Sequence, residues 1–292
     1  MSKIFDVVRK GNIIDFGDLC AAEVTDSGEL PQPSELPIGR IGTLPSPSNG
    51  RRVVRLRLST FSPIFPFDRP DHVAAEQYRI IRTRILHHPK RPRSIVLSSA
   101  CSGDGKTVTS INIAASLALK DDSSVLLVDS DLRRPRVAEA LGIPNSPGLA
   151  EILSGEANLE SALVCPEQFP NLFILPSGNA AQSAAELLDC ERWRLLVQQT
   201  RARFSHVIFD APPIAMLADY DLIQLVCDAA ILVMRPDHSD RAACLKALAA
   251  VPQEKMLGVV LNCVENWWLW KTPVYGYYGR QDYGRSLPEA RP

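Results

Sequence analysis

The chain has 292 residues, of which 46% are hydrophobic and 22% charged, and its formal net charge is −1. This composition is typical of a globular protein with a sizeable core, and the lack of a basic excess argues against general nucleic-acid binding. No apolar run approaches the roughly 18 residues of a membrane-spanning helix, and no signal peptide is evident. The seven cysteines form no C-x-x-C pair and no zinc-like spacing, so we expect reduced thiols in an intracellular protein.

Residues 1–70 are predicted to be a flexible N-terminal segment. Within it, Ser2–Lys10 could form a short amphipathic helix, and residues 25–50 are rich in proline, serine and glycine. Arg51–Leu58 alternates apolar residues with arginine, which predicts an edge strand whose arginines face water. A basic surface for anionic lipid is the alternative interpretation of these arginines.

A helix is predicted over Asp71–His87, with Asp71 near its start. It contains Glu76, Arg79 and Arg82, which lie three residues apart and therefore share one helical face. Such a stripe of charges is either a solvated surface or a self-complementary contact between subunits. The spacing alone favours the solvated surface.

The next stretch predicts a phosphate-binding loop between a strand and a helix. Ser94–Ser99 is an apolar run suited to a buried strand, and Val108–Leu119 has apolar residues at helical spacing. The segment between them matches G-x-x-x-x-G-K-S/T except that Ala100 replaces the first glycine. Glycines, backbone N–H groups and a helix N-terminus can together cradle phosphate. The candidate nucleotide-binding residues are Ser102, Gly103, Asp104, Gly105, Lys106, Thr107 and Val108.

Carboxylates follow two further predicted strands. Ser124–Asp131 is an apolar run that ends in Asp129 and Asp131, and His206–Pro213 contains Asp210 at the end of another such run. The carboxyl ends of parallel strands meet at one sheet edge, where ligands of α/β proteins bind. Any one of these aspartates could be a turn residue or a helix cap, but three of them after a phosphate loop predict a shared site.

Strands and helices continue to alternate to residue 262, which predicts an α/β P-loop NTPase fold with a doubly wound, mostly parallel sheet and helices on both faces. The expected domain covers residues 71–264. Its further strands are Leu172–Pro176, Ala229–Met234 and Met256–Asn262, and its further helices are a short one between Gly148 and Gly155, then Ala184–Arg203, Asp219–Cys227 and Arg241–Val251. The long helix is expected to face the core with Leu187, Leu188, Leu195 and Leu196.

Residues 265–292 form a tail of different composition. Three tryptophans crowd together at its start, and glycines separate the tyrosines that follow. The glycines and prolines disfavour a helix, so we expect the phenols to lie on a mobile segment that could enter an active site. The alternative is an aromatic tail that packs against the domain or mediates weak association. The tyrosines are Tyr275, Tyr277, Tyr278 and Tyr283.

From about Asp71 to Tyr283, the sequence resembles the bacterial tyrosine kinases of capsule and exopolysaccharide synthesis, or BY-kinases. Residues 100–107 look like the Walker A motif of that family, residues 126–135 resemble its Walker A′ motif, and residues 207–213 resemble its Walker B motif. Glu76, Arg79 and Arg82 match its E-x-x-R-x-x-R oligomerisation motif. This match raises the subunit-contact interpretation above the solvated surface.

The resemblance implies an ATP- and Mg²⁺-dependent autokinase that regulates polymer synthesis and export. Lys106 and the loop would hold the phosphates, Thr107, Asp131 and Asp210 would bind Mg²⁺, and Asp129 would act as the base, with Lys106, Asp129 and Asp131 as the catalytic set. Asn262 is either an adenine contact or a turn former. The implied partners are other copies in a homo-oligomeric ring, whose tails are phosphorylated between subunits, a transmembrane chain-length-regulator-type adaptor and a tyrosine phosphatase. The kinase would be located in the cytoplasm, held at the inner face of the membrane by a partner.

The sequence departs from the family in several respects: four tyrosines make a sparse cluster, the tryptophan-rich insertion before them is unusual, and two motifs differ. Ser102 stands where proline is usual, and the usual Asn-Pro is replaced around Gln182–Ala185. Two other functions share many of these residues: a partition ATPase of the Min/Par class, and a non-catalytic nucleotide-binding regulator of polysaccharide export. Partition ATPases carry a signature lysine where this chain has Cys101, and they lack a tyrosine tail. Retention of the lysine, the threonine and all three aspartates argues against the non-catalytic regulator.

Overall fold

The computed structural model describes residues 52–57, 64–65, 72–180, 183–214, 218–236 and 238–264. The predicted N-terminal helix over Ser2–Lys10, the segment 25–50 and the four tail tyrosines lie outside the described residues. In the part that is described, no helix is both long and apolar enough to cross a membrane.

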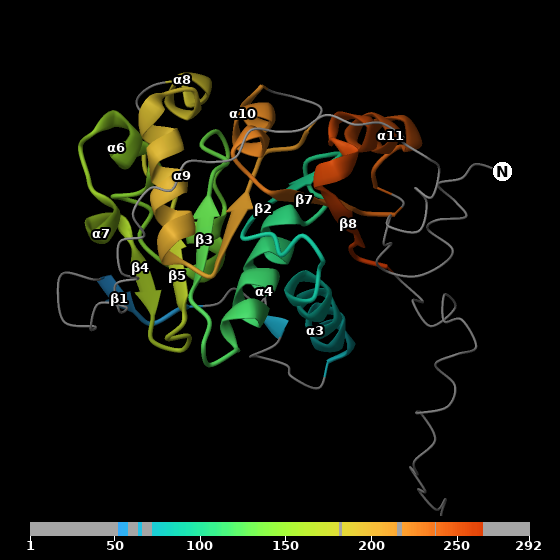
Figure 1. The fold of residues 1–292 in the computed structure, drawn as a ribbon, viewed down its shortest axis with the longest axis horizontal. Coiled ribbons are helices and arrows are strands. Elements are labelled where there is room, and N and C mark those ends of the chain that lie inside the picture. Colours follow the sequence, from blue (N-terminus) through green and yellow to red (C-terminus); the bar gives the residue numbers. More distant parts are fainter. Residues whose placement is uncertain are drawn as a thin grey trace, which may run out of the picture.

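An eight-stranded sheet forms the centre of the molecule (Figure 1). Its strand order is β1-β4-β5-β3-β6-β2-β7-β8, and every pair is parallel except β4 with β5. The fold is therefore the predicted mostly parallel P-loop architecture. The strands are β1 (Arg52–Val54), β2 (Ser94–Ser99), β3 (Val125–Asp129), β4 (Val164–Pro166), β5 (Leu172–Leu175), β6 (His206–Asp210), β7 (Ala229–Met234) and β8 (Met256–Leu261).

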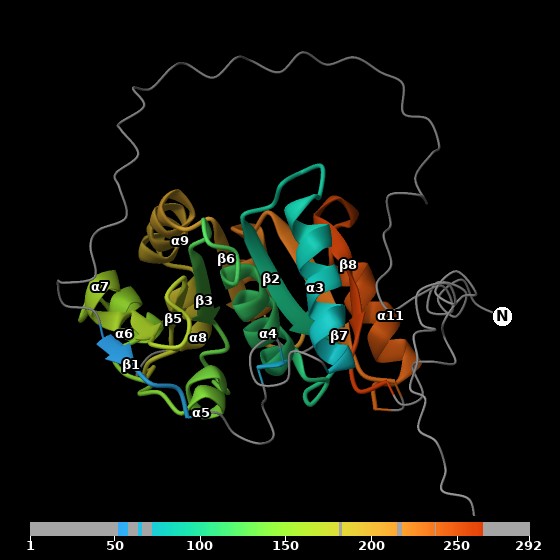
Figure 2. The same ribbon diagram turned by 90° about the horizontal axis from the view of Figure 1, so that it is seen from below.

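Helices cover both faces of this sheet (Figures 1 and 2), and two hydrophobic clusters fill the two interfaces. Helices α3, α4 and α5 pack on one face, and α6, α8, α9, α10 and α11 contribute to the cluster on the other. Because β2, β3 and β6 are covered on both sides, they read as continuous apolar runs. The helices are α3 (Val73–Leu86), α4 (Lys106–Ala118), α5 (Val137–Leu141), α6 (Leu149–Ser154), α7 (Leu159–Ala162), α8 (Ala184–Leu188), α9 (Glu191–Arg203), α10 (Asp219–Leu225) and α11 (Arg241–Ala250), with a 3₁₀ turn at Gln253–Lys255.

The prediction of one long helix over Ala184–Arg203 is wrong. The chain turns between α8 and α9 because Cys190 has an extended backbone, with φ −80° and ψ 157°. The second helix therefore starts with a new phase, and its buried face carries Trp193, Leu196, Val197 and Thr200. Leu195, which was expected in the core, is 48% exposed.

The N-terminal edge of the fold differs in detail from the prediction. The first long helix, α3, begins at Val73, and its N-cap is His72, whose side chain accepts a hydrogen bond from the Ala74 amide. The predicted edge strand is present as β1 but has only three residues, and it pairs with β4, a strand that the sequence pattern did not indicate.

Residues before position 72 also contribute to the core. Ile64 is fully buried, and the Phe65 amide donates to Asn112 Oδ1 on α4 at 2.8 Å. Together with β1, these contacts extend the fold N-terminally beyond the expected boundary at residue 71. Arg55 and Arg57, which follow β1, are exposed as expected, whereas Arg52 within β1 is half-buried and donates to the Pro147 carbonyl oxygen at 3.3 Å.

Asp228 holds the start of β2 in place, and we expect Asp228→Ala to destabilise the protein. Its Oδ2 accepts from the amides of Arg93 and Ser94 at 2.9 and 3.0 Å, and its Oδ1 accepts from Arg201 at 2.7 Å. The Ser94 amide belongs to a fully buried residue, so its loss of a partner should cost about 1–3 kcal/mol of unfolding free energy. Urea denaturation would measure this loss, and Asp122→Ala, at an exposed turn, is the control.

The stabilisation of the fold by Asp228 should depend on pH. Burial alone would raise the pKa of Asp228, but the hydrogen bonds from Ser94 and Arg93 and the charge of Arg201 outweigh burial and lower it. A carboxyl group with a lowered native pKa stabilises the fold above its unfolded pKa, and that stabilisation is lost as the pH falls through the native pKa. The difference between wild type and Asp228→Ala should therefore shrink at acidic pH. A difference that is the same at neutral and strongly acidic pH would contradict this role.

Candidate active site

The phosphate loop connects β2 to α4 and contains two residues in the left-handed backbone region. Gly103 has φ +93° and Gly105 has φ +88°. A Cβ on Gly105 would lie 1.9 Å from Asn262 Nδ2, so both the conformation and the space require glycine there. α4 starts at Lys106, two residues earlier than predicted, which places the N-terminal amides of the helix at the end of this loop.

The other loop residues differ in accessibility. Ser102 and Gly103 are exposed, whereas Val108 is half-buried in the first turn of α4. Exposed backbone next to a helix N-terminus is the arrangement by which phosphate loops bind anions.

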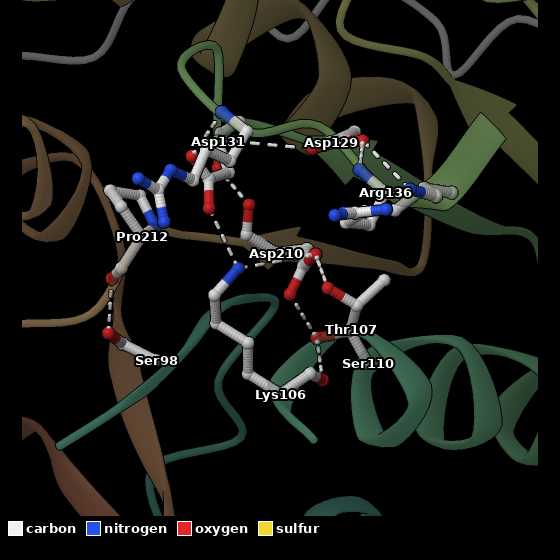
Figure 3. Close-up of polar contacts among 12 residues, drawn as sticks. Ser98, Lys106, Thr107, Ser110, Asp129, Asp131, Arg136, Asp210 and Pro212 are labelled. Carbon is white, nitrogen blue, oxygen red and sulfur yellow. Dashed lines mark hydrogen bonds and ion pairs between the residues drawn. The ribbon is translucent and has the colours of Figure 1, made fainter. Parts of the chain in front are cut away.

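Lys106 points from α4 toward the carboxylates at the ends of β3 and β6 (Figure 3). Its Nζ lies 2.9 Å from Asp131 Oδ2 and 3.9 Å from Asp210 Oδ2. Burial by itself would lower the pKa of Lys106, but the charges of Asp210 and Asp131 outweigh burial and raise it. The ammonium group is therefore charged and lies among acidic groups, where it can neutralise further negative charge.

Asp210 is fully buried at the end of β6. The Thr107 hydroxyl donates to its Oδ2 at 2.6 Å, and the Ser110 hydroxyl donates to its Oδ1 at 3.0 Å (Figure 3). Burial raises the pKa of Asp210, although Lys106 and the two hydroxyl groups oppose this effect. Ser110 was not predicted; its only signal in the sequence is its position one turn after the phosphate loop.

Asp129 ends β3 and pairs in register with Asp210 on the adjacent strand. Its Oδ2 accepts from the amides of Arg136 and Val137 at 3.1 and 3.0 Å, and its Oδ1 accepts from the Asp131 amide at 3.3 Å (Figure 3). Burial and the nearby charge of Asp210 raise the pKa of Asp129 to about 7, against the effect of the Val137 amide and Lys106. A carboxyl group with such a pKa can exchange a proton near neutral pH.

The structure thus brings Lys106, Asp129, Asp131 and Asp210 together from α4, β3 and β6, as the strand-end argument predicted. Asp131 follows β3 in a turn, where its Oδ1 accepts from the Arg134 amide at 3.1 Å. The parallel pairing of β3 with β6 and of β6 with β2 is what delivers these groups to one edge of the sheet.

Asp104 is part of the phosphate loop, but its buried carboxylate forms hydrogen bonds with Cys101 and with a segment distant in the sequence. Its Oδ2 accepts from the Cys101 amide at 2.9 Å, and its Oδ1 accepts from the Ser239 hydroxyl at 2.5 Å and contacts His238 Nδ1 at 3.0 Å. Asn262 Nδ2 donates to the Asp104 carbonyl oxygen at 2.9 Å. The segments that follow β7 and β8 therefore hold the loop in its curved conformation.

An ion pair between Arg133 and Asp219, which the sequence did not predict, holds the turn after β3 in place. Arg133 Nε and Nη2 donate to the two carboxylate oxygens of Asp219 at 2.6 and 3.1 Å. Asp219 is buried at the start of α10, so this bidentate pair links the turn after Asp131 to that helix. The Arg-Arg-Pro sequence alone did not indicate which carboxylate it would contact.

The three residues predicted to mediate oligomerisation lie on α3 and are not part of the carboxylate cluster. Arg79 Nη1 pairs with Glu76 Oε2 at 2.8 Å, and both side chains are substantially exposed. Arg82 instead donates to the Ser116 carbonyl oxygen on α4 at 3.3 Å. Glu76 and Arg79 therefore present charge on the surface, while Arg82 also holds α3 against α4.

Comparison with known proteins matches this architecture to kinases. The AAA-domain family model matches residues 92–242. The tyrosine-protein kinase YwqD of Bacillus subtilis is 34% identical over 217 residues, which are 73% of this chain and 90% of that protein. The tyrosine-protein kinase CpsD of Streptococcus pneumoniae is 35% identical over 65% of this chain and 84% of its own length.

Solved structures lead to the same family. The kinase domain of VpsO is 30% identical, superposes with a TM-score of 0.60, and the match covers 66% of this chain and 97% of that chain. The chimerical protein CapA2B2 is 26% identical with a TM-score of 0.65, over 70% of this chain and 91% of its own. The chain therefore belongs to the bacterial tyrosine kinases, and it is a tyrosine-protein kinase built on a P-loop fold.

Proposed function

We propose that this kinase transfers phosphate from ATP to the C-terminal tyrosines of neighbouring subunits, and that this reaction regulates the polymerisation and export of a capsule or exopolysaccharide. The observation that carries the proposal is the cluster of Lys106, Asp129, Asp131 and Asp210 beside a phosphate loop, in a chain that also contains a row of four tyrosines. Phosphoryl transfer depends mainly on positioning and charge neutralisation, which this cluster can supply.

The residues of the loop fit a nucleotide with Mg²⁺. Backbone amides of residues 102–108 and the Lys106 ammonium would hold the phosphates. Mg²⁺ would be held by Thr107 and by Asp131 and Asp210, and when bound it neutralises charge on the phosphates. Within the described ranges, no group of three or more histidine, cysteine or acidic side chains forms a metal site. Mg²⁺ usually takes only one or two protein carboxylates and completes its shell with water and phosphate.

Asp129 is our candidate for the base that accepts the tyrosine proton. An unperturbed tyrosine hydroxyl has a pKa of about 10, so a nearby base with a pKa closer to neutrality assists its deprotonation. The raised pKa of Asp129, about 7, supports this role. Asn262 contacts the loop through the Asp104 carbonyl oxygen, and its amide is also our candidate for contact with adenine.

Assembly of subunits would bring one tail to the next active site. Glu76 and Arg79 on α3, with Arg82, are our candidates for the contact that closes a ring. We further propose a transmembrane adaptor of the chain-length-regulator type, which would hold the kinase at the inner face of the membrane, and a tyrosine phosphatase that resets the tail. Each phosphotyrosine adds about −1.5 to −2 charges, so phosphorylated tails should repel one another and favour disassembly.

Transfer between subunits predicts labelling in a mixture of two variants, neither of which can phosphorylate a tail on its own. The acceptor carries Lys106→Met and an intact tail; the donor has an intact site, with Tyr275, Tyr277, Tyr278 and Tyr283 changed to phenylalanine. After incubation with ATP and Mg²⁺, with and without the cytosolic segment of the cognate adaptor, peptide mass spectrometry should find phosphate on the acceptor tail only in the mixture.

Three other outcomes would change the proposal. A wild-type tail that is phosphorylated while the acceptor is never labelled would indicate transfer within one chain. ATP hydrolysis by wild type without any phosphotyrosine, under both conditions, would indicate a partition-type ATPase. Nucleotide binding without turnover would indicate a non-catalytic regulator.

A further inference from the structure

An apolar groove lies between the C-terminal half of α3 and the edge strand β8, two elements that lie side by side in Figure 2. Its volume is about 390 Å³. Arg84, His87 and His88, at the end of α3 and in the turn after it, line part of this groove. The apolar lining comes from Ile81, Ile85, Ile231, Leu257, Val259 and Val260.

The groove lies at an open side of the sheet. β8 is the last strand in the order of the strands that the structure describes, so its outer edge presents backbone groups for further pairing. Leu257 and Val260 on this strand are only half-buried, although they pack against the α3 side of the core. An apolar edge of this kind usually gains a cover from another segment or another protein.

The chain continues for four described residues beyond Val260, the last residue of β8 that lines this groove. Directly after β8, Cys263 has a left-handed backbone with φ +54°, which is uncommon for a residue other than glycine. The Cys263 amide donates to Asn262 Oδ1 at 2.9 Å, within the same bend. The chain direction therefore changes at the end of β8, and the description of the fold ends at Val264.

The sequence that follows has the composition to fill the groove. Trp267, Trp268, Leu269 and Trp270 lie within six residues of Val264. Buried aromatic side chains remove about 150–250 Å² each from water, and an indole ring also attracts an arginine or a protonated histidine over its face. Six extended residues span roughly 20 Å, about the length of a six-residue strand such as β8, so a chain that turns back after Val264 can reach the whole groove.

We propose that residues 265–272 of the same chain dock in the groove between α3 and β8, with the tryptophans on its apolar floor and Arg84, His87 and His88 around them. The residues that line the groove on α3 are Ile81, Thr83, Arg84 and Ile85, and Thr83 lies one turn after Arg79 on the face that carries Glu76 and Arg79. Docking and the subunit contact would therefore use adjoining parts of one helix.

Docking would also direct the tyrosines away from their own site; this consequence rests on the proposed function. Tyr275 lies five residues after Trp270, which limits its reach to about 18 Å from the anchor. The carboxylate cluster lies three strands from β8 at β6 and four at β3, about 14 and 19 Å across the sheet, and at the carboxyl ends of those strands, whereas the end of α3 that lines the groove leads into the amino end of β2. The first tyrosines would thus be more accessible to a neighbouring subunit.

Photo-crosslinking of the full chain tests the docking directly and without nucleotide. Benzoylphenylalanine in place of Trp268 should crosslink, on illumination, to the tryptic peptide Ile85–Lys90. In an equal mixture of ¹⁴N- and ¹⁵N-labelled protein, the two peptides of every crosslinked pair should carry the same isotope, since both come from one chain. Mixed-isotope pairs would overturn the proposal in favour of a second copy, and crosslinks that never include this peptide would overturn the groove as the docking site. The same probe at Tyr283 is the control and should not label the peptide.

Tryptophan fluorescence gives an independent readout. Leu257→Glu places a charge in the groove and should shift the emission of the full chain to the red and increase its quenching by acrylamide. Val53→Glu is the matched control, because Val53 is 56% exposed on β1 at the opposite edge of the sheet. Trp193 is buried in the core, so its contribution to the fluorescence emission should be the same in both variants. An emission spectrum that Leu257→Glu leaves unchanged would contradict docking, whether or not the tail is ever phosphorylated.

Discussion

Lys106→Met is expected to abolish tyrosine phosphorylation, with a loss of at least about 10²- to 10³-fold, as for other removals of a preorganised charge from an active site. Methionine keeps most of the side-chain length but removes the ammonium group that lies 2.9 Å from Asp131 Oδ2 and 3.9 Å from Asp210 Oδ2. The phosphates would then lose a cation that no other residue of the loop supplies. Mass spectrometry of the tail after incubation with ATP and Mg²⁺ measures the loss.

The same substitution should also destabilise the protein when no nucleotide is present. The Lys106 side chain is only 12% exposed, and without its charge the carboxyl groups of Asp131 and Asp210 face each other across the site. Breaking a buried ion pair at one partner typically costs about 3–5 kcal/mol. Lys246→Met, on the exposed face of α11, makes the same chemical change and is the control. A Lys106→Met protein that still phosphorylates its tail would show that the cluster is not the active site.

The sequence predicted those parts of the site whose signals are local. The spacing of Gly105, Lys106 and Thr107 identifies the phosphate loop, and two of the buried strands, β3 and β6, end in an aspartate. The parallel order of β3, β6 and β2 then brings these groups together without any further information. The register of Asp129 with Asp210 is a consequence of that order.

Contacts between distant segments could not be predicted in the same way. Asp104 was selected as a loop residue, but its partners His238 and Ser239 lie more than 130 positions later in a segment with no motif of its own. The same limit applies to Arg133 and Asp219, which are 86 positions apart. A single sequence gives no signal for such pairs, because either partner is an ordinary polar residue of a turn or a helix start.

The errors in secondary structure have local causes. β4 has three residues, too few to show an alternating pattern, and β1 covers only three of the eight residues whose alternation predicted a strand. The break between α8 and α9 depends on the extended backbone of Cys190, and neither proline nor glycine marks it. Leu195 then turns outward because the second helix starts in a new phase.

Asp129→Asn is expected to reduce tyrosine phosphorylation by about 10²- to 10⁴-fold if Asp129 is the base, which is the usual contribution of such a group. Asparagine has almost the same shape and can still accept hydrogen bonds from the Arg136 and Val137 amides through its oxygen. It cannot accept the proton of a tyrosine hydroxyl. An unchanged rate would show that another group is the base, and Asp131 would be the next candidate.

The stability of this variant should have a different pH dependence from that of wild type. The pKa of Asp129 is about 7 in the native protein, against about 4 in the unfolded chain, so between these values the native state holds a proton that the unfolded state has lost. Stability that depends on this proton falls as the pH rises from about 4 to 7. Asparagine does not titrate, so the free energy of unfolding of the variant should rise relative to that of wild type as the pH increases across this range. The full shift corresponds to on the order of 4 kcal/mol. Urea denaturation at pH 5 and pH 8 measures the change, and Asp122→Asn, at an exposed turn, is the control. A parallel pH dependence in wild type and Asp129→Asn would mean that the proton resides elsewhere, and the fully buried Asp210 would be its most direct alternative site.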